Sequence, residues 1–184
     1  AYAGPSWILP EFQARTKQLE RVVNSFNFNG SKWFLCGFDS AFLWVRDRRW
    51  LKHVFSASGA YLAQGAGDGI YDPEFKDWAV PLGRRFRSLR IWMVLNYFGV
   101  SGIQKHLRKS IAQADKLRSL LDSSDLFVRP TPTELGLVVI RLAAGDDATQ
   151  RVANGLLVGE GGDKKGGFCL FPSVFNGEKI IRVA

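Results

Sequence analysis

The sequence has few of the residues that build disulfide frameworks or metal centres, with two cysteines and two histidines among its 184 residues. Cys36 and Cys169 lie inside apolar runs, where free thiols are commonly buried, so we expect no disulfide framework. The spacing of the cysteines and histidines does not match a zinc finger, and we expect no metal site.

Long hydrophobic runs are also absent. A membrane-spanning helix needs about 20 apolar residues in succession, and the runs here are far shorter. We therefore expect a soluble protein without a membrane partner. The first ten residues lack the basic start and apolar centre of a secretory signal peptide, and we expect a cytoplasmic protein. The sequence begins without methionine, which leads us to expect a processed product or a piece of a longer protein.

The sequence is rich in hydrophobic residues and carries a net positive charge. Hydrophobic residues make up 46% and charged residues 23%, a globular composition, and the formal net charge is +8. The basic residues are spread along the chain except for one dense cluster at residues 84–90. No nucleic-acid-binding motif accompanies this cluster. We therefore expect no nucleic-acid partner, although a non-catalytic basic module that binds nucleic acid or acidic partners stays open as an alternative.

A lysine between two apolar segments is the first candidate for chemistry. Residues 24–29 alternate between polar and aromatic side chains and end at the turn signal Asn29-Gly30. Lys32 follows between a serine and a tryptophan. A desolvated lysine on such a turn can act as a nucleophilic amine, whereas a solvated one is an ordinary hairpin residue. The local pattern leaves both interpretations open.

The first half of the chain is predicted to mix short elements. We expect a helix at residues 10–19, strands at 21–28 and within 32–45, and a short helix at 46–54. Residues 56–69 contain four glycines and show no apolar periodicity. Such a loop is typical of a closing lid, or equally of a disordered surface connection.

Apolar residues at helical spacing predict two helices in the second half, at residues 84–98 and 101–121, separated by Gly99. Beyond them we expect strands at 126–128 and 135–142, a weak helix at 148–158 and a closing strand pair at 168–171 and 179–183. This pattern predicts a small α+β domain. We place the domain boundary inside the helical region, between residues 89 and 90.

Several parts of the sequence resemble one family. Residues 27–33 resemble the cofactor-lysine motif of the group II decarboxylases that use pyridoxal 5'-phosphate. Residues 78–92 resemble the family nearly residue for residue, and residues 1–12 resemble the segment upstream of the lysine. Tyr61 lies at the family's distance after the lysine. The resemblance is greatest to the aromatic-L-amino-acid decarboxylase branch, and it implies the C-terminal portion of such an enzyme.

The resemblance implies roles for five residues. Lys32 would bind the cofactor aldehyde as a Schiff base, which requires an unprotonated amine. Asn29 and Ser31 would donate hydrogen bonds to the cofactor phosphate. Tyr61 would protonate the substrate carbon after carbon dioxide leaves. Gly83 would leave room for the aromatic ring of the substrate.

The resemblance also implies an α/β fold. Residues 1–89 would be the end of a fold-type I PLP-dependent transferase-like large domain that binds the cofactor, and residues 90–184 would be the small α+β C-terminal domain. The implied substrate is an aromatic L-amino acid, and the implied assembly is a homodimer. An aromatic aldehyde synthase of the same family is the nearest alternative. Tyr61 argues against it, because that group typically carries phenylalanine there.

The sequence departs from the family at specific places. Relatives usually carry proline and histidine where this chain has Gly30 and Ser31. The family's aspartate that pairs with the pyridine nitrogen would lie upstream of Ala1. Because the cofactor withdraws electrons more weakly without that carboxylate, we expect little or no decarboxylation by this chain alone.

Overall fold

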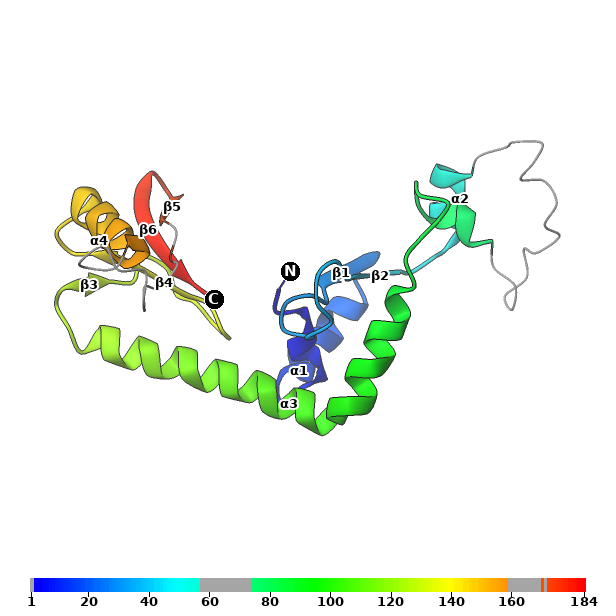
Figure 1. Ribbon diagram of the computed structural model, residues 1–184, viewed down its shortest axis with the longest axis horizontal. Helices are drawn as coiled ribbons and strands as arrows, with labels where there is room; N and C mark the ends of the chain where they lie inside the picture. Colours follow the sequence, from blue (N-terminus) through cyan, green and yellow to red (C-terminus); the bar gives the residue numbers. More distant parts are fainter. Residues whose placement is uncertain (1, 57–73, 159–169, 171) are drawn as a thin grey trace. The chain divides into compact units, whose positions relative to one another are not determined.

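The computed structural model describes residues 2–56, 74–158, 170 and 172–184 (Figure 1). It has mixed helix and sheet content and divides into two compact units, Ala1–Gln104 and Lys105–Ala184. The division between the units falls inside a helix, and the domain boundary expected between residues 89 and 90 stays a prediction. Within the described residues, no helix combines the length and the apolar character that crossing a membrane requires.

The first unit is built from short elements around a two-stranded sheet (Figure 1). Its elements in order are η1 (Gly4–Ile8), α1 (Pro10–Glu20), β1 (Ser25–Asn29), β2 (Ala41–Val45), α2 (Arg49–Phe55), η2 (Phe75–Trp78) and the start of α3 (Arg87–Asp122). Helix α1 begins with proline, which has no backbone N–H to leave unpaired, and it confirms the helix predicted at residues 10–19.

An aromatic face holds the β1–β2 hairpin to η1. The strands pair antiparallel, so that Phe26 lies opposite Trp44 and Phe28 lies opposite Phe42. The Phe28 and Phe42 rings stack with centroids 4.6 Å apart, and Trp7 of η1 stacks on Phe26 at 3.8 Å. Because side chains alternate between faces along a strand, the spacing of two residues between the aromatics places them all on one face.

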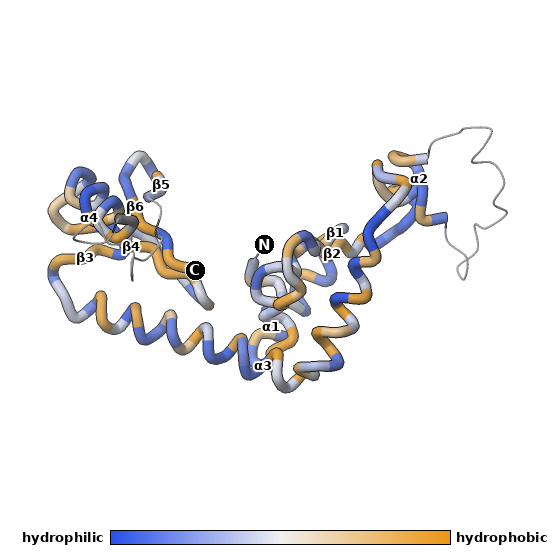
Figure 2. Tube along the Cα trace, viewed as in Figure 1, coloured by the Kyte–Doolittle hydropathy of each residue, from blue (hydrophilic) through white to orange (hydrophobic). Residues whose placement is uncertain are grey.

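Helix α3 carries the predicted break. Gly99 has φ 64° and ψ 173°, a non-helical conformation inside the helix, as the two predicted helices separated by this glycine require. The second predicted helix has the expected apolar stripe: Ile103, Leu107, Ala114 and Leu121 are buried. Figure 2 shows the corresponding alternation of hydrophobic and hydrophilic segments along α3.

The second unit is an antiparallel four-stranded sheet in the order β3-β4-β6-β5. Its elements after α3 are β3 (Phe127–Val128), β4 (Val138–Leu142), α4 (Asp146–Val158), β5 (Pro172–Phe175) and β6 (Glu178–Val183). Its core is contributed by α3, α4 and the two central strands, through Ala114, Leu121, Val138, Ile140, Ala153 and Ile181. The small α+β pattern predicted for this half is therefore present.

The closing hairpin differs from its prediction in one strand. The strand expected at residues 179–183 is present as part of β6, but its partner β5 lies at Pro172–Phe175. Residues 168, 169 and 171 lie outside the described residues. Asn176 and Gly177 join β5 to β6 with φ of 51° and 83°, a two-residue hairpin turn with both residues left-handed. This Asn-Gly turn was the signal that would have placed β5 correctly.

Candidate functional site

Lys32 lies in a closed loop that we call the Lys32 loop, residues Gly30–Ser40, between β1 and β2. The Ser40 carbonyl closes the loop by accepting hydrogen bonds from the backbone N–H of Gly30 at 2.7 Å and of Ser31 at 3.3 Å. Inside it, Cys36 N–H donates to the Gly30 carbonyl at 3.0 Å. A Cβ on Gly30 would stand 2.5 Å from the Phe42 ring, so glycine permits this close approach.

The Lys32 side chain is exposed in the described part of the chain. Its carbonyl accepts a hydrogen bond from Leu35 N–H at 3.1 Å, and the neighbouring Trp33 packs edge-on against Tyr2 with centroids 5.2 Å apart. The backbone around Lys32 is therefore fixed while its amine stays accessible.

Asn29 and Ser31 form a pair on the same turn. Asn29 Oδ1 accepts hydrogen bonds from Ser31 N–H at 2.8 Å and from Ser31 Oγ at 2.5 Å. The hydroxyl proton of Ser31 is used in this bond, so donation to a phosphate requires the hydroxyl to rotate. The amide N–H₂ of Asn29 is the donor group of this side chain. The two predicted phosphate-binding residues are thus brought together by the structure.

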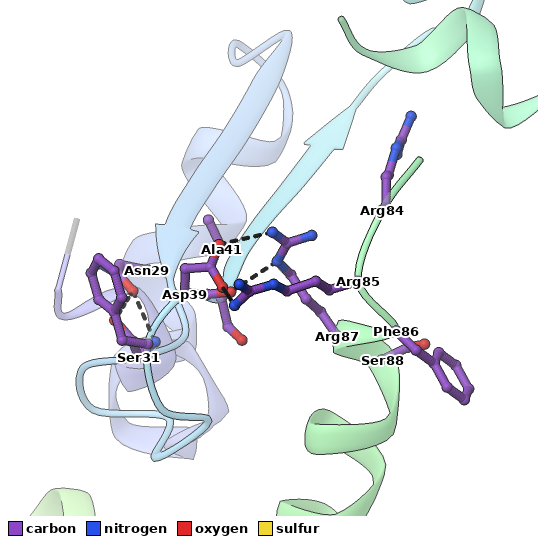
Figure 3. A pocket seen from close by; sticks show the side chains of 11 residues that line it. Asn29, Ser31, Asp39, Ala41, Arg84, Arg85, Phe86, Arg87 and Ser88 are labelled. Atoms are coloured by element: carbon purple, nitrogen blue, oxygen red, sulfur yellow. Dashed lines mark hydrogen bonds and ion pairs between the residues drawn. The ribbon is translucent and has the colours of Figure 1, made fainter. Parts of the chain in front are cut away.

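The pair lines a cavity of about 560 Å³. The other lining residues come from the end of the Lys32 loop and from the segment that leads into α3: Phe38, Asp39, Ser40, Ala41, Arg84, Arg85, Phe86, Arg87 and Ser88. Figure 3 shows that Arg85 and Arg87 reach toward Asp39, whereas Arg84 and Phe86 point away from it. Three arginines and one aspartate give the lining a formal charge of +2.

Asp39 is the acceptor that organises the basic cluster. Arg87 donates from Nε to the Asp39 carbonyl at 3.0 Å and from Nη2 to the Asp39 carboxylate at 2.8 Å. Arg85 Nη1 lies 3.8 Å from the other carboxylate oxygen. The hydrogen bond from Arg87 is the main cause that holds the pKa of Asp39 below its usual value. Two arginines of the basic cluster at residues 84–90 thus pair with one carboxylate.

The sequence did not single out Asp39. Its partner Arg87 is 48 residues away, so no local spacing links them. The sequence shows that both residues are charged, but a single acidic residue beside an apolar segment does not indicate which basic residue it pairs with. The pairing is a tertiary contact.

The cavity fits a phosphate group. Among the described residues the buried Ser40 hydroxyl has no hydrogen-bond partner, and buried polar groups ordinarily have one. The lining also supplies the Asn29 amide, the Ser31 hydroxyl and the guanidinium groups, which are donors that anions bind well. These donors and the net positive charge suit an anionic group of this kind.

Of the predicted site residues that the structure describes, Lys32 and Gly83 do not line this cavity. Tyr61 lies outside the described residues. Gly83 is exposed in the segment before α3, and a Cβ built on it meets no atom within 4 Å among the described residues. The catalytic role of Tyr61 and the steric role of Gly83 therefore stay predictions.

The sequence of the chain decides the family. Residues 1–143 match the family described as the pyridoxal-dependent decarboxylase conserved domain. The chain belongs to this family. The resemblance seen around Lys32 and in residues 78–92 is thereby confirmed. The decarboxylase family uses pyridoxal phosphate, a cofactor whose phosphate suits the cavity beside Asn29 and Ser31.

Curated members of the decarboxylase family match the chain over almost its whole length. It is 38% identical over 186 residues to tryptophan decarboxylase 2 of Oryza sativa subsp. japonica, covering 100% of this chain and 37% of the relative. It is 35% identical to the histidine decarboxylase of Drosophila melanogaster, covering 99% and 20%, and 34% identical to the aromatic-L-amino-acid decarboxylase of Manduca sexta, covering 100% and 34%. The chain thus spans between a fifth and two fifths of the length of these relatives.

Solved structures from the decarboxylase family share the fold. The structure of Oryza sativa TDC with PLP and tryptamine has a TM-score of 0.87 at 31% identity, covering 100% of this chain and 38% of the other. That of Rhodiola rosea 4-hydroxyphenylacetaldehyde synthase has a TM-score of 0.82 at 25% identity, covering 100% and 36%. The same fold is thus found in proteins named for decarboxylation and for aldehyde formation.

Proposed function

We propose that the protein containing these residues decarboxylates an aromatic L-amino acid to the amine and carbon dioxide, using pyridoxal phosphate held by Lys32. The observation that carries the proposal is the Lys32 loop. One turn presents Lys32 directly after the Asn29–Ser31 pair, and that pair lines a positively charged cavity. The lysine at the position of the family's cofactor lysine thus follows directly after two residues that can donate hydrogen bonds to a phosphate.

Each residue has a defined task in this proposal. Lys32 supplies the amine that attaches the cofactor. Asn29 and Ser31 bind its phosphate and so fix its orientation. When bound, the cofactor withdraws the electron pair that carbon dioxide leaves on the substrate carbon. Tyr61 donates its phenolic proton to that carbon, and Gly83 leaves space for the aromatic ring.

The substrate class follows from relatives and from the family resemblance. Relatives are named as tryptophan, tyrosine, histidine and aromatic-L-amino-acid decarboxylases. The branch of the family that acts on dihydroxyphenyl and indole amino acids carries glycine at the position of Gly83, whereas the histidine branch carries serine there. We therefore propose a bulky aromatic substrate, and we propose a cytoplasmic homodimer as the assembly of the whole protein.

Attachment of the cofactor tests the proposal directly. The purified chain is incubated with pyridoxal phosphate, reduced with borohydride, digested and analysed by mass spectrometry. We expect the pyridoxyl group on Lys32 and its loss from that peptide in Lys32→Arg, which keeps the positive charge but not the amine. Attachment that is spread over surface lysines without preference for Lys32 would refute the proposed role of this residue.

Amine production tests the reaction. Tryptophan, tyrosine and histidine are supplied separately to this chain and to a longer protein that contains it, and the amines are separated by chromatography. We expect product from the longer protein and little or none from the chain alone. Strong decarboxylation by the chain alone would overturn the expectation that it needs further residues.

An aldehyde synthase is a second candidate, because the Rhodiola rosea synthase shares the fold at 25% identity. The two reactions differ in their products. Oxidative deamination releases an aldehyde and hydrogen peroxide, whereas simple decarboxylation releases an amine. Tyr61 favours the amine, since the synthase group typically carries phenylalanine at this position. A peroxide assay on the active protein separates the two candidates.

A further inference from the structure

The Lys32 loop is attached at its end to the start of α3. Phe38 and Asp39, the residues just before its closing residue Ser40, accept three hydrogen bonds from two arginines of that helix. Arg87 makes two of them to Asp39, and Arg90 Nη1 donates the third to the Phe38 carbonyl at 2.7 Å. We call this set of contacts the arginine clasp.

The clasp acts on the residues that close the loop. Asp39 is bonded covalently to Ser40, whose carbonyl accepts the N–H groups of Gly30 and Ser31. Ser31 in turn precedes Lys32. A short path therefore runs from the Arg87 guanidinium through Asp39 and Ser40 to the backbone on the N-terminal side of Lys32. Every link in this path is a covalent bond or a hydrogen bond of 3.3 Å or less.

We propose that Arg87, acting through Asp39, is a positioning residue that holds the Lys32 loop in the conformation needed for cofactor attachment. This inference rests on the proposed function of Lys32. Attachment of the cofactor requires the amine and the phosphate donors to meet two ends of one small molecule, so displacement of the loop separates the two tasks. In this proposal, the clasp keeps Lys32 and the Asn29–Ser31 pair in a constant position relative to each other.

The geometry of Arg87 explains why an arginine serves here. Its Nε and Nη2 donate at once to a backbone carbonyl and to a carboxylate of the same residue. A lysine ammonium is a point charge that can pair with the carboxylate but lacks the planar fork. Arg87→Lys should therefore keep the ion pair and lose much of the hold on the Asp39 backbone.

Hydrogen exchange measures the hold on the loop without any cofactor. The amides of Gly30, Ser31 and Cys36 are compared in the wild-type chain, in Arg87→Ala and in Arg87→Lys. We expect exchange at these amides to become about tenfold faster or more in Arg87→Ala, and less so in Arg87→Lys. The amides of α1 report the folding of the first unit and those of β4 and β6 report the folding of the second, and neither set should change. Unchanged protection of the loop in Arg87→Ala would overturn the proposal.

Arg49→Ala is the matched control. Arg49 also pairs with an aspartate, making hydrogen bonds to Asp47 at 2.5 to 3.0 Å, but it lies outside the Lys32 loop. We expect the loop amides to exchange in Arg49→Ala as they do in the wild type. Faster loop exchange in this variant would show a general response to the loss of charge and would contradict a specific clasp. If Arg87→Ala does not fold, Arg87→Lys decides the same question.

Site-selective labelling connects the clasp to the chemistry. After borohydride reduction with pyridoxal phosphate, the ratio of label on Lys32 to label on the exposed Lys105 is measured for each folded variant. We expect Arg87→Ala to lower this ratio about tenfold, and the exchanged pair Asp39→Arg with Arg87→Asp to recover part of it. A purely structural role would leave the ratio unchanged in folded protein, and that result would overturn the inference.

The two proposals fail in different ways. If the wild-type chain shows no preference for Lys32, the proposed function of this residue fails, and the role of Arg87 in cofactor attachment fails with it. If wild-type Lys32 is labelled selectively and Arg87→Ala is labelled equally, only the positioning role of Arg87 fails. Selective labelling that is lost in Arg87→Ala supports both.

Discussion

The backbone of Gly4 in η1 lies against the side chain of Phe28 in β1, so closely that a Cβ on Gly4 would stand 2.3 Å from the Phe28 Cβ. Gly4 is buried, and Phe28 is 6% exposed. This contact seats η1 on the hairpin that leads into the Lys32 loop. Because no side chain fits there, the contact predicts a position that tolerates only glycine.

We expect Gly4→Ala to lower the free energy of unfolding of the first unit by about 1–3 kcal/mol, because overpacking forces the neighbouring backbone to shift. Urea unfolding followed by circular dichroism, which reports on both units, measures the change. Gly155→Ala is the control, since a Cβ at Gly155 in α4 meets no atom of the described residues within 4 Å. In that helix the substitution should stabilise by about 0.5–1 kcal/mol. Equal effects of the two substitutions would contradict the close contact.

Burial in the core of the second unit predicts how two further substitutions change stability. Ile181 of β6 is 1% exposed and belongs to the core between the sheet and the helices. We expect Ile181→Ala to cost about 2–5 kcal/mol through lost burial and the cavity that remains. Val174 on the neighbouring strand β5 is 65% exposed, and Val174→Ala should change stability by about 0.5 kcal/mol or less. Thermal unfolding of both variants checks the difference.

The arginine clasp predicts a pH dependence. The hydrogen bond from the Arg87 side chain to the Asp39 carboxylate lowers the pKa of Asp39 in the folded chain. The carboxylate therefore stabilises the fold fully above its unfolded pKa of about 4, and this contribution is lost as pH falls through the lower folded value. Asp39→Asn should be less stable than wild type near neutral pH, and the difference should shrink below about pH 4. A difference that stays constant down to about pH 2 would refute the clasp as an ionic contact.

Salt gives a second measurement of the same contact. Arg87 and Asp39 are only partly buried, so added salt screens their attraction. We expect the stability difference between wild type and Asp39→Asn near neutral pH to decrease in about 1 M sodium chloride. The hydrogen bond from Arg87 to the Asp39 backbone carbonyl is present in both proteins, so part of the hold on the loop remains.

The Asn29–Ser31 pair predicts an effect on cofactor binding that rests on the proposed function. Asn29→Ala removes both a phosphate donor and the acceptor that fixes Ser31. We expect about tenfold weaker binding of pyridoxal phosphate, the loss of one hydrogen bond to a charged group. Asn27→Ala is the control, because the Asn27 side chain donates to the Phe42 carbonyl, and Asn27 does not line the cavity. Fluorescence titration with pyridoxal phosphate compares them, and equal affinities would count against the phosphate site.

Much of the local structure was predictable because it depends on neighbours in the sequence. The aromatic residues of β1 recur at every second position, and the Asn29-Gly30 turn ends that strand. The helical spacing in α3 and its interruption by Gly99 follow from side-chain geometry and from the freedom of glycine at positive φ. The type of each of these elements and the place where it ends therefore follow from properties that act over a few residues.

The segment after Lys32 was harder to predict. Strands were expected within residues 32–45, with a break near residues 37–40, but only Ala41–Val45 is a strand, and the residues before it belong to the Lys32 loop. Its turns depend on hydrogen bonds between Gly30, Cys36 and Ser40 and on Leu35 and Gly37 at positive φ. Apolar composition gave no sign of these contacts, because leucine is rare in the left-handed region.

The sequence by itself determined the family and predicted the cofactor lysine and the phosphate-binding residues before it, because a motif keeps its chemistry at fixed spacing along the chain. Only the tertiary structure decided what holds that motif in place. Asp39 and Arg87 are 48 residues apart, and ion pairs at that separation follow from how the chain packs rather than from any local pattern. The sequence therefore determined which residue we propose as the reactive group, whereas the fold determined the contacts around the loop that carries it.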